Sequence, residues 1–129
     1  MNFIIDTNVY SEAQRGNKKI IDLLNKAEHI FLTTIVEAEL RAGFAFGTKK
    51  LENNKLLDKF MSQSNVFTLN ISQATTKIFA ELYAELRKTG KTIGQNDLWI
   101  SSLAIENNLP VLTLDADFKN VKAIDLIVF

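Results

Sequence analysis

The N-terminal stretch contains the feature that most constrains how this chain folds. Phe3, Ile4 and Ile5 form a continuous apolar run, and Asp6 follows directly. Such a run predicts a strand buried on both faces, as in a parallel sheet covered by helices. In open sheets of this kind the ligand crevice lies outside the carboxyl ends of the strands. Asp6 is therefore expected at the mouth of a candidate site, unless it only begins a turn or caps the next helix.

Short apolar runs alternate with amphipathic segments along the whole sequence. Helices are expected at 20–27, 34–46, 49–62, 72–90 and 97–107, and further strands at 29–33, 65–71, 111–114 and 123–129. Residues 9–16 are polar and are expected to end in a turn. This alternation predicts an α/β fold: a single domain over 1–129 with a central, mostly parallel sheet and helices on both faces.

Two glutamates lie near the start of the predicted helix at 34–46, and they have different expected roles. Thr34 followed by Glu37 fits the capping box, in which the acid three residues after the cap bonds back to the backbone. Glu37 thus has a structural role at the helix start. Glu39 has none, so it is expected to point either to solvent or into a polar pocket.

The composition excludes some kinds of metal site and argues against one way of binding nucleic acid. There are no cysteines, and His29 is the one histidine, so a thiolate or histidine-rich site is excluded. Any metal must be held mainly by oxygen, which favours Mg²⁺ or Mn²⁺. Lys+Arg and Asp+Glu are both 15, which argues against a protein that coats nucleic acid by bulk charge.

Nothing in the sequence predicts a membrane segment. No apolar run approaches spanning length, and the N-terminus lacks a basic-then-apolar signal pattern. A cytoplasmic location is therefore expected.

Four acids from distant parts of the sequence are expected to converge on one edge of the sheet. Asp6 and Asp115 each follow a strand, whereas Glu39 and Asp97 lie near the starts of helices that begin on that side. Clustered carboxylates repel each other and raise their own pKa values unless a cation is present. A divalent metal site is the simplest reason for such a cluster, and it suits phosphodiester hydrolysis.

At these residues the chain resembles PIN-domain proteins, and closely the VapC-type toxins of prokaryotic toxin–antitoxin pairs. The matching pieces occur in the family's order and span nearly the whole chain: Ile5-Asp6-Thr7-Asn8, Glu39-Leu40-Arg41-Ala42-Gly43, Asn96-Asp97-Leu98-Trp99-Ile100 and Leu112-Thr113-Leu114-Asp115-Ala116-Asp117-Phe118. The resemblance implies a PIN-like fold and a metal-dependent endoribonuclease that uses Mg²⁺ or Mn²⁺.

The resemblance also implies roles for individual residues and partners. Catalytic positions fall on four acids, of which all but the glutamate would bind metal: Asp6, Glu39, Asp97 and Asp115. Supporting positions, which would orient ligands or water, fall on three more residues: Asn8, Thr113 and Asp117. RNA is the implied substrate and a cognate antitoxin the implied partner. A homodimer is expected through apolar residues of 47–62.

Other classes remain open from the residues alone. An aspartyl-nucleophile phosphatase needs a second acid two residues after the first, but that position is Asn8. A receiver-like phosphoacceptor module needs an early acidic doublet, which is missing. A non-catalytic RNA-binding module does not need converging acids, because they repel phosphate when no metal is present.

Overall fold

A five-stranded sheet, parallel at every pairing, organises residues 1–128, the part of the chain that this computed structural model describes. The element order is β1 (Asn2–Ile5), α1 (Thr7–Gln14), α2 (Lys18–Lys26), β2 (His29–Thr33), α3 (Thr34–Phe46), α4 (Lys50–Met61), β3 (Val66–Leu69), α5 (Gln73–Thr89), α6 (Gln95–Asn107), β4 (Val111–Thr113), a 3-10 helix η1 (Ala116–Asn120) and β5 (Leu126–Val128). The last predicted strand is thus present, and its final position, residue 129, lies outside the described residues.

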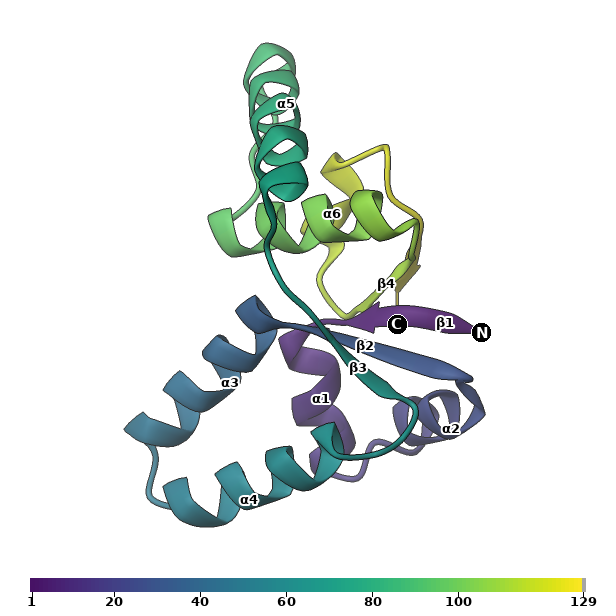
Figure 1. Cartoon of the computed structure of the whole chain (residues 1–129), viewed down its shortest axis with the longest axis vertical. Helices are drawn as coiled ribbons and strands as arrows, with labels where there is room; N and C mark the ends of the chain where they lie inside the picture. The colour runs from purple at the N-terminus through teal and green to yellow at the C-terminus, as the bar shows by residue number, and fades with distance from the viewer. Residues whose placement is uncertain (129) are drawn as a thin grey trace.

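β1 lies at the centre of the sheet, whose strand order is β3-β2-β1-β4-β5. Ile4 pairs with Phe31 of β2 on one side and with Val111 of β4 on the other. Helices α1 to α4 lie on one side of the sheet, α6 lies on the other, and α5 packs on α6 and extends away from the sheet (Figure 1). The predicted α/β fold is confirmed, and all strand C-termini reach the same edge of the sheet.

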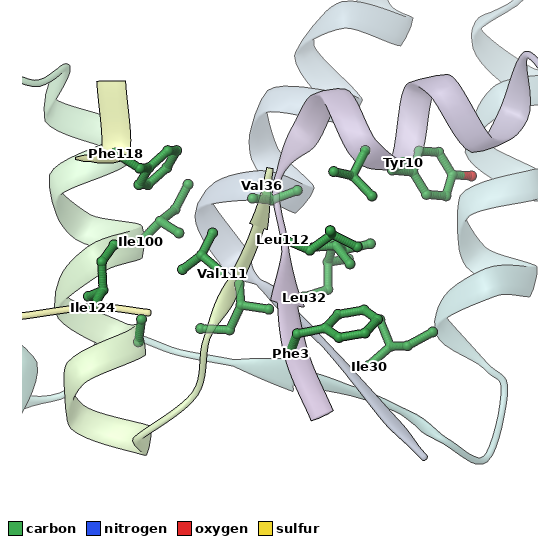
Figure 2. Close-up of a cluster of buried hydrophobic side chains, with 14 of the residues drawn as sticks. Phe3, Tyr10, Ile30, Leu32, Val36, Ile100, Val111, Leu112, Phe118 and Ile124 are labelled. Atoms are coloured by element: carbon green, nitrogen blue, oxygen red, sulfur yellow. The ribbon is translucent and has the colours of Figure 1, made fainter. Parts of the chain in front are cut away.

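The core follows from the apolar run of β1. Phe3, Ile4 and Ile5 are all fully buried, and because successive strand residues point to opposite faces, both faces must be covered. Figure 2 shows core side chains packed between α1 and α6: Phe3 and Leu112 belong to strands, and Ile100 belongs to α6. Burying one such side chain contributes about 1.5–3 kcal/mol.

The chain after β1 forms a helix that the sequence did not predict, α1, and the predicted turn follows it at residues 15–16. Asp6 is the N-cap of α1, and Val9 and Tyr10 bury the inner face of this short helix. The interpretation of Asp6 as a helix cap is therefore correct, and it does not exclude a role in the site. α6 also begins at Gln95, before the predicted start at Asp97.

The cap of α3 lies one residue before the predicted one. The Thr33 hydroxyl accepts the backbone N–H of Val36 at 3.1 Å, so Thr34 is already the first helical residue. Glu37 therefore does not occupy the capping-box position. Its carboxylate instead pairs with Arg41 one turn later at 2.8 Å.

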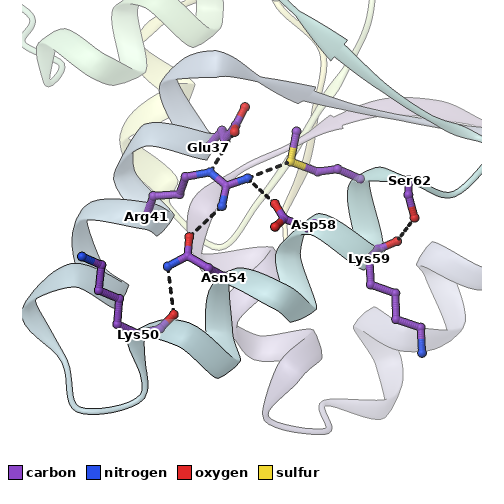
Figure 3. Close-up of polar contacts among 8 residues, drawn as sticks. Glu37, Arg41, Lys50, Asn54, Asp58, Lys59 and Ser62 are labelled. Atoms are coloured by element: carbon purple, nitrogen blue, oxygen red, sulfur yellow. Dashed lines mark hydrogen bonds and ion pairs between the residues drawn. The ribbon is translucent and has the colours of Figure 1, made fainter.

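α3 and α4 form a helical hairpin, and Arg41 joins them (Figure 3). Its guanidinium donates to Glu37 on its own helix at 2.8 Å, and to Asn54 and Asp58 on α4 at 2.7 Å each. One side chain thus satisfies three acceptors between the two helices.

The ends of α5 and α6 match the sequence signals. Ser72, the first residue of the predicted helix 72–90, caps α5, and Gly90 and Asn108 end α5 and α6 in the left-handed region with φ of 69° and 52°. No helix within residues 1–128 is both long enough and apolar enough to span a membrane.

Candidate active site

Asp6 is a buried carboxylate that the protein holds in a fixed orientation. Its side chain is 5% exposed and stands where β1 passes into α1. Oδ1 accepts the Thr7 backbone N–H at 2.8 Å, and Oδ2 accepts the Thr113 hydroxyl at 2.8 Å. The pKa of Asp6 is raised: burial is the largest cause, the charges of Glu39 and Asp115 also raise it, and the two hydrogen bonds partly offset this rise.

Thr113 links Asp6 to the second strand-terminal acid. It is the last residue of β4 and is fully buried. Its hydroxyl oxygen accepts a hydrogen bond from the Asp115 backbone N–H at 2.9 Å, and the same hydroxyl donates a hydrogen bond to Asp6. The Asp115 carboxylate in turn accepts the Asp117 N–H at 2.9 Å and caps η1. This chain of bonds fixes the end of β4 beside the end of β1.

Glu39 lies in the second turn of α3 and is hydrogen-bonded to the first residue of α1. The Thr7 hydroxyl donates to Glu39 Oε1 at 2.8 Å, and the Glu39 charge acts on Asp6. Glu37, by contrast, faces α4 through Arg41. Of the two glutamates, the structure therefore places Glu39 beside Asp6, as the sequence predicts.

Asp97 is half-buried at the third position of α6, and it does not cap that helix. The N-cap is Gly94, which has no side chain to bond, and the described residues offer Asp97 no hydrogen bond. Burial, together with the charges of four other acids, raises the pKa of Asp97 to about 7; the four are Asp6, Asp115, Glu39 and Asp117. The four predicted acids therefore come together at one edge of the sheet.

The other two predicted supporting residues have different surroundings. Asn8 accepts the Leu114 backbone N–H at 3.3 Å, so it joins α1 to the end of β4. Asp117 is exposed, and it acts on Asp97 through its charge. Their roles in orienting ligands or water stay predictions.

Thr7 is a site residue that the sequence analysis did not single out. It lies within the matched segment Ile5-Asp6-Thr7-Asn8, but a hydroxyl one position after an acid is usually a helix-start residue. Its bond to Glu39 joins the start of α1 to α3 across 32 positions. No local sequence pattern indicates that contact.

The chemistry of the donors fits a hard divalent cation. All are carboxylate, hydroxyl or amide oxygens, and their mutual repulsion, visible in the pKa of Asp97, is what a bound cation relieves. In the described part of the chain no three acidic or histidine side chains are already arranged to hold a metal ion. Mg²⁺ keeps several waters and binds through one or two carboxylates, so a ready three-ligand cage is not required.

Comparisons with known proteins agree with this geometry. The PIN domain family matches residues 3–124. Ribonuclease VapC2 of Rickettsia felis is 33% identical, over 94% of this chain and 92% of that protein. Ribonuclease VapC5 of Mycobacterium tuberculosis is 29% identical, over 89% of this chain and 84% of its own length.

A solved structure also superposes along the full length. The crystal structure of VapBC2 from Rickettsia felis bound to a promoter DNA fragment matches with a TM-score of 0.88 and 31% identity, covering 100% of this chain and 99% of that one. The carboxylates at the sheet edge, the family match and the similarity to VapC ribonucleases agree, and the chain belongs to the PIN-domain family.

Proposed function

We propose that this chain is the toxin of a toxin–antitoxin pair, a metal-dependent endoribonuclease that hydrolyses RNA phosphodiester bonds. The convergence of Asp6, Glu39, Asp97 and Asp115 carries the proposal, because such a cluster is unfavourable without a cation. The full-length similarity to proteins named VapC ribonucleases supports the choice of RNA as substrate.

The metal would be held by Asp6, Asp97 and Asp115, and we expect Mg²⁺ or Mn²⁺. PIN-domain ribonucleases generally use a divalent metal, and oxygen donors favour these two ions. Such an ion supplies Lewis-acid chemistry, lowering the pKa of bound water and neutralising charge on the phosphodiester. The role of this chain is to present the carboxylates in a fixed geometry.

Hydrogen bonds from the protein set the direction of two of these carboxylates. Asp6 receives N–H and O–H donors on opposite oxygens, which leaves its remaining lone pairs to face the cluster. Thr7 directs Glu39, whose free oxygen would bind a water or the attacked phosphate. Asp97 receives no donor in the described residues, so its charge depends most on a cation.

We also propose a cognate antitoxin and a homodimer. The Rickettsia felis structure is of a VapBC2 pair, which supports an antitoxin partner for this chain. Exposed apolar side chains on the α3–α4 hairpin support a protein interface there: Phe46 is 96% exposed and Leu51 is 71% exposed. A monomeric mass in light scattering at micromolar concentration would contradict the dimer. A cytoplasmic location follows from the RNA substrate and stays a prediction.

Cleavage of RNA with and without chelator tests the function. Purified protein with Mn²⁺ should cut structured RNA and leave 5′-phosphate ends, and excess EDTA should abolish the cut. Equal cleavage in EDTA would contradict the metal mechanism. If the protein binds RNA but leaves it uncut with every metal ion tested, the result would favour the non-catalytic alternative.

A further inference from the structure

A small groove lies between α5, the loop that follows it and the start of α6. Its volume is about 160 Å³, and its wall includes Tyr83, Arg87, Lys91 and Leu98. α5 and α6 pack against each other on the face of the sheet opposite the α3–α4 hairpin (Figure 1). We call this hollow the α5–α6 groove.

The groove presents an aromatic ring and two cations in a defined arrangement. Tyr83 is 48% exposed, and the Arg87 guanidinium lies 5.6 Å from the centre of its ring while donating to its hydroxyl at 3.0 Å. Lys91 is anchored next to them, because its backbone N–H bonds to the Leu86 carbonyl at 3.0 Å. Over residues 1–128 neither Arg87 nor Lys91 forms an ion pair.

Two elements that border the groove also carry or contact the acids of the cluster. Leu98 in its wall is the neighbour of Asp97 on α6. The Thr92 carbonyl in its loop accepts the Asn120 side chain at 2.8 Å, and Asn120 ends the 3-10 helix that Asp115 caps. The groove and the carboxylate cluster therefore share the first turn of α6 and the loop that contacts η1.

We propose that the α5–α6 groove binds the RNA strand next to the bond that is cut, with the cations on phosphates and a base stacked on Tyr83. This inference rests on the proposed function. The acidic cluster repels RNA, and the chain has no net charge to offset that repulsion, so holding substrate requires local cations. An exposed ring beside arginine is the arrangement that sequence-tolerant single-strand binders use.

A simpler account is that these cations only complement the dipole at the end of α5. Lys88 separates the two accounts, because it lies in the same last turn, is exposed, and is absent from the groove wall. A dipole role predicts no effect on RNA for any of the three cations. Attraction by general charge predicts equal effects.

The experiment measures RNA affinity without cleavage, by fluorescence anisotropy in an Asp97→Asn background with a short single-stranded RNA at several salt concentrations. Arg87→Ala/Lys91→Ala should weaken binding about tenfold or more at low salt, and should reduce the salt slope by about 0.7 for each cation removed. Lys88→Ala should stay within about twofold of its parent because it lies outside the groove. Tyr83→Ala should weaken binding roughly tenfold, and Tyr83→Phe should retain it because stacking needs only the ring.

Three results would overturn the proposal. One is an equal loss for Lys88→Ala, which would mean general charge attraction. The second is unchanged RNA affinity in the double variant. The third is a set of groove variants that bind a protein partner more weakly but bind RNA as tightly as their parent. If the wild type cuts no RNA yet the groove variants still lose RNA binding, the proposed function fails and the groove assignment stands.

Discussion

The hydroxyl of Thr113 donates a hydrogen bond to Asp6 Oδ2 at 2.8 Å, joining residues 107 positions apart. The same oxygen accepts the Asp115 N–H at 2.9 Å. One small side chain thereby sets the separation of two proposed metal ligands. The order of the two strands explains why this is possible, because β4 lies directly beside β1 in the sheet.

Replacing Thr113 with valine keeps the shape of the side chain and removes this link. The Asp6 carboxylate and the Asp115 N–H both lose a partner in a buried place, so Thr113→Val should lower the free energy of unfolding by about 1–3 kcal/mol. Mn²⁺ affinity should fall roughly 10–100-fold. Urea unfolding and metal titration measure the two effects. Thr113→Ser, which keeps the hydroxyl, is the control, and equal behaviour of both variants would contradict the orienting role.

Asp97 predicts how the stability of metal-free protein depends on pH. Its folded pKa is about 7, whereas an unfolded Asp titrates near about 4. Between these values the native state binds more protons than the unfolded state, so stability falls as pH rises through roughly 4 to 7. Below that window Asp97 is protonated in both the native and the unfolded state, so it no longer makes stability depend on pH.

Asp97→Asn should remove this slope. In EDTA above pH 7 the variant should exceed wild type by on the order of 1 kcal/mol, after allowance for solvent screening of a half-buried group. That corresponds to a rise of several degrees in Tm for a domain of this size. Parallel melting curves at several pH values would show it, and identical slopes for both proteins would argue against a clustered carboxylate.

The contacts of Arg41 between α3 and α4 should contribute measurably to the stability of the fold. It contacts three acceptors and its side chain is 32% exposed, so Arg41→Ala should cost about 1–2 kcal/mol of stability. Arg15 is the matched control, since its pair with Glu12 is on the surface with 70% of the arginine side chain exposed. Arg15→Ala should cost less than about 0.5 kcal/mol. Similar losses in denaturant titrations of the two variants would contradict the linking role.

Two adjacent buried serines in α6 should respond differently to removal of the hydroxyl. Ser102 donates to the Leu98 carbonyl at 2.7 Å, whereas Ser101 Oγ has no hydrogen-bond partner among the described residues. Ser101→Ala should therefore be at least as stable as wild type, and Ser102→Ala should be about 1 kcal/mol less stable than Ser101→Ala. Equal Tm values for the two variants would contradict this difference.

The arrangement of the proposed acids could be predicted because it depends on topology. A buried strand that ends in an acid, such as Ile5 before Asp6, needs only alternation of strands and helices to bring that acid to the common edge. Short-range signals also held where one residue type decides the backbone, as at Gly90.

What could not be predicted depends on contacts between distant residues. α1 has two buried residues, Val9 and Tyr10, and its polar start resembles a turn, so no helical period is visible. Thr33 and Thr34 are equally good caps by residue type. The extent of β2 decides between them, because Thr33 still pairs with Leu69 of β3 and the helix begins after it.

Asp97→Asn tests whether the four acids form one metal-dependent site. The measurement is the Mn²⁺-induced rise in Tm, taken beside RNA cleavage, for wild type and variant. A ligand stabilises the folded state in proportion to how tightly it binds, so the loss of one carboxylate should shrink the Mn²⁺ shift. Cleavage should fall by orders of magnitude while the fold persists. A variant that keeps wild-type cleavage and the full Mn²⁺ shift would contradict the site.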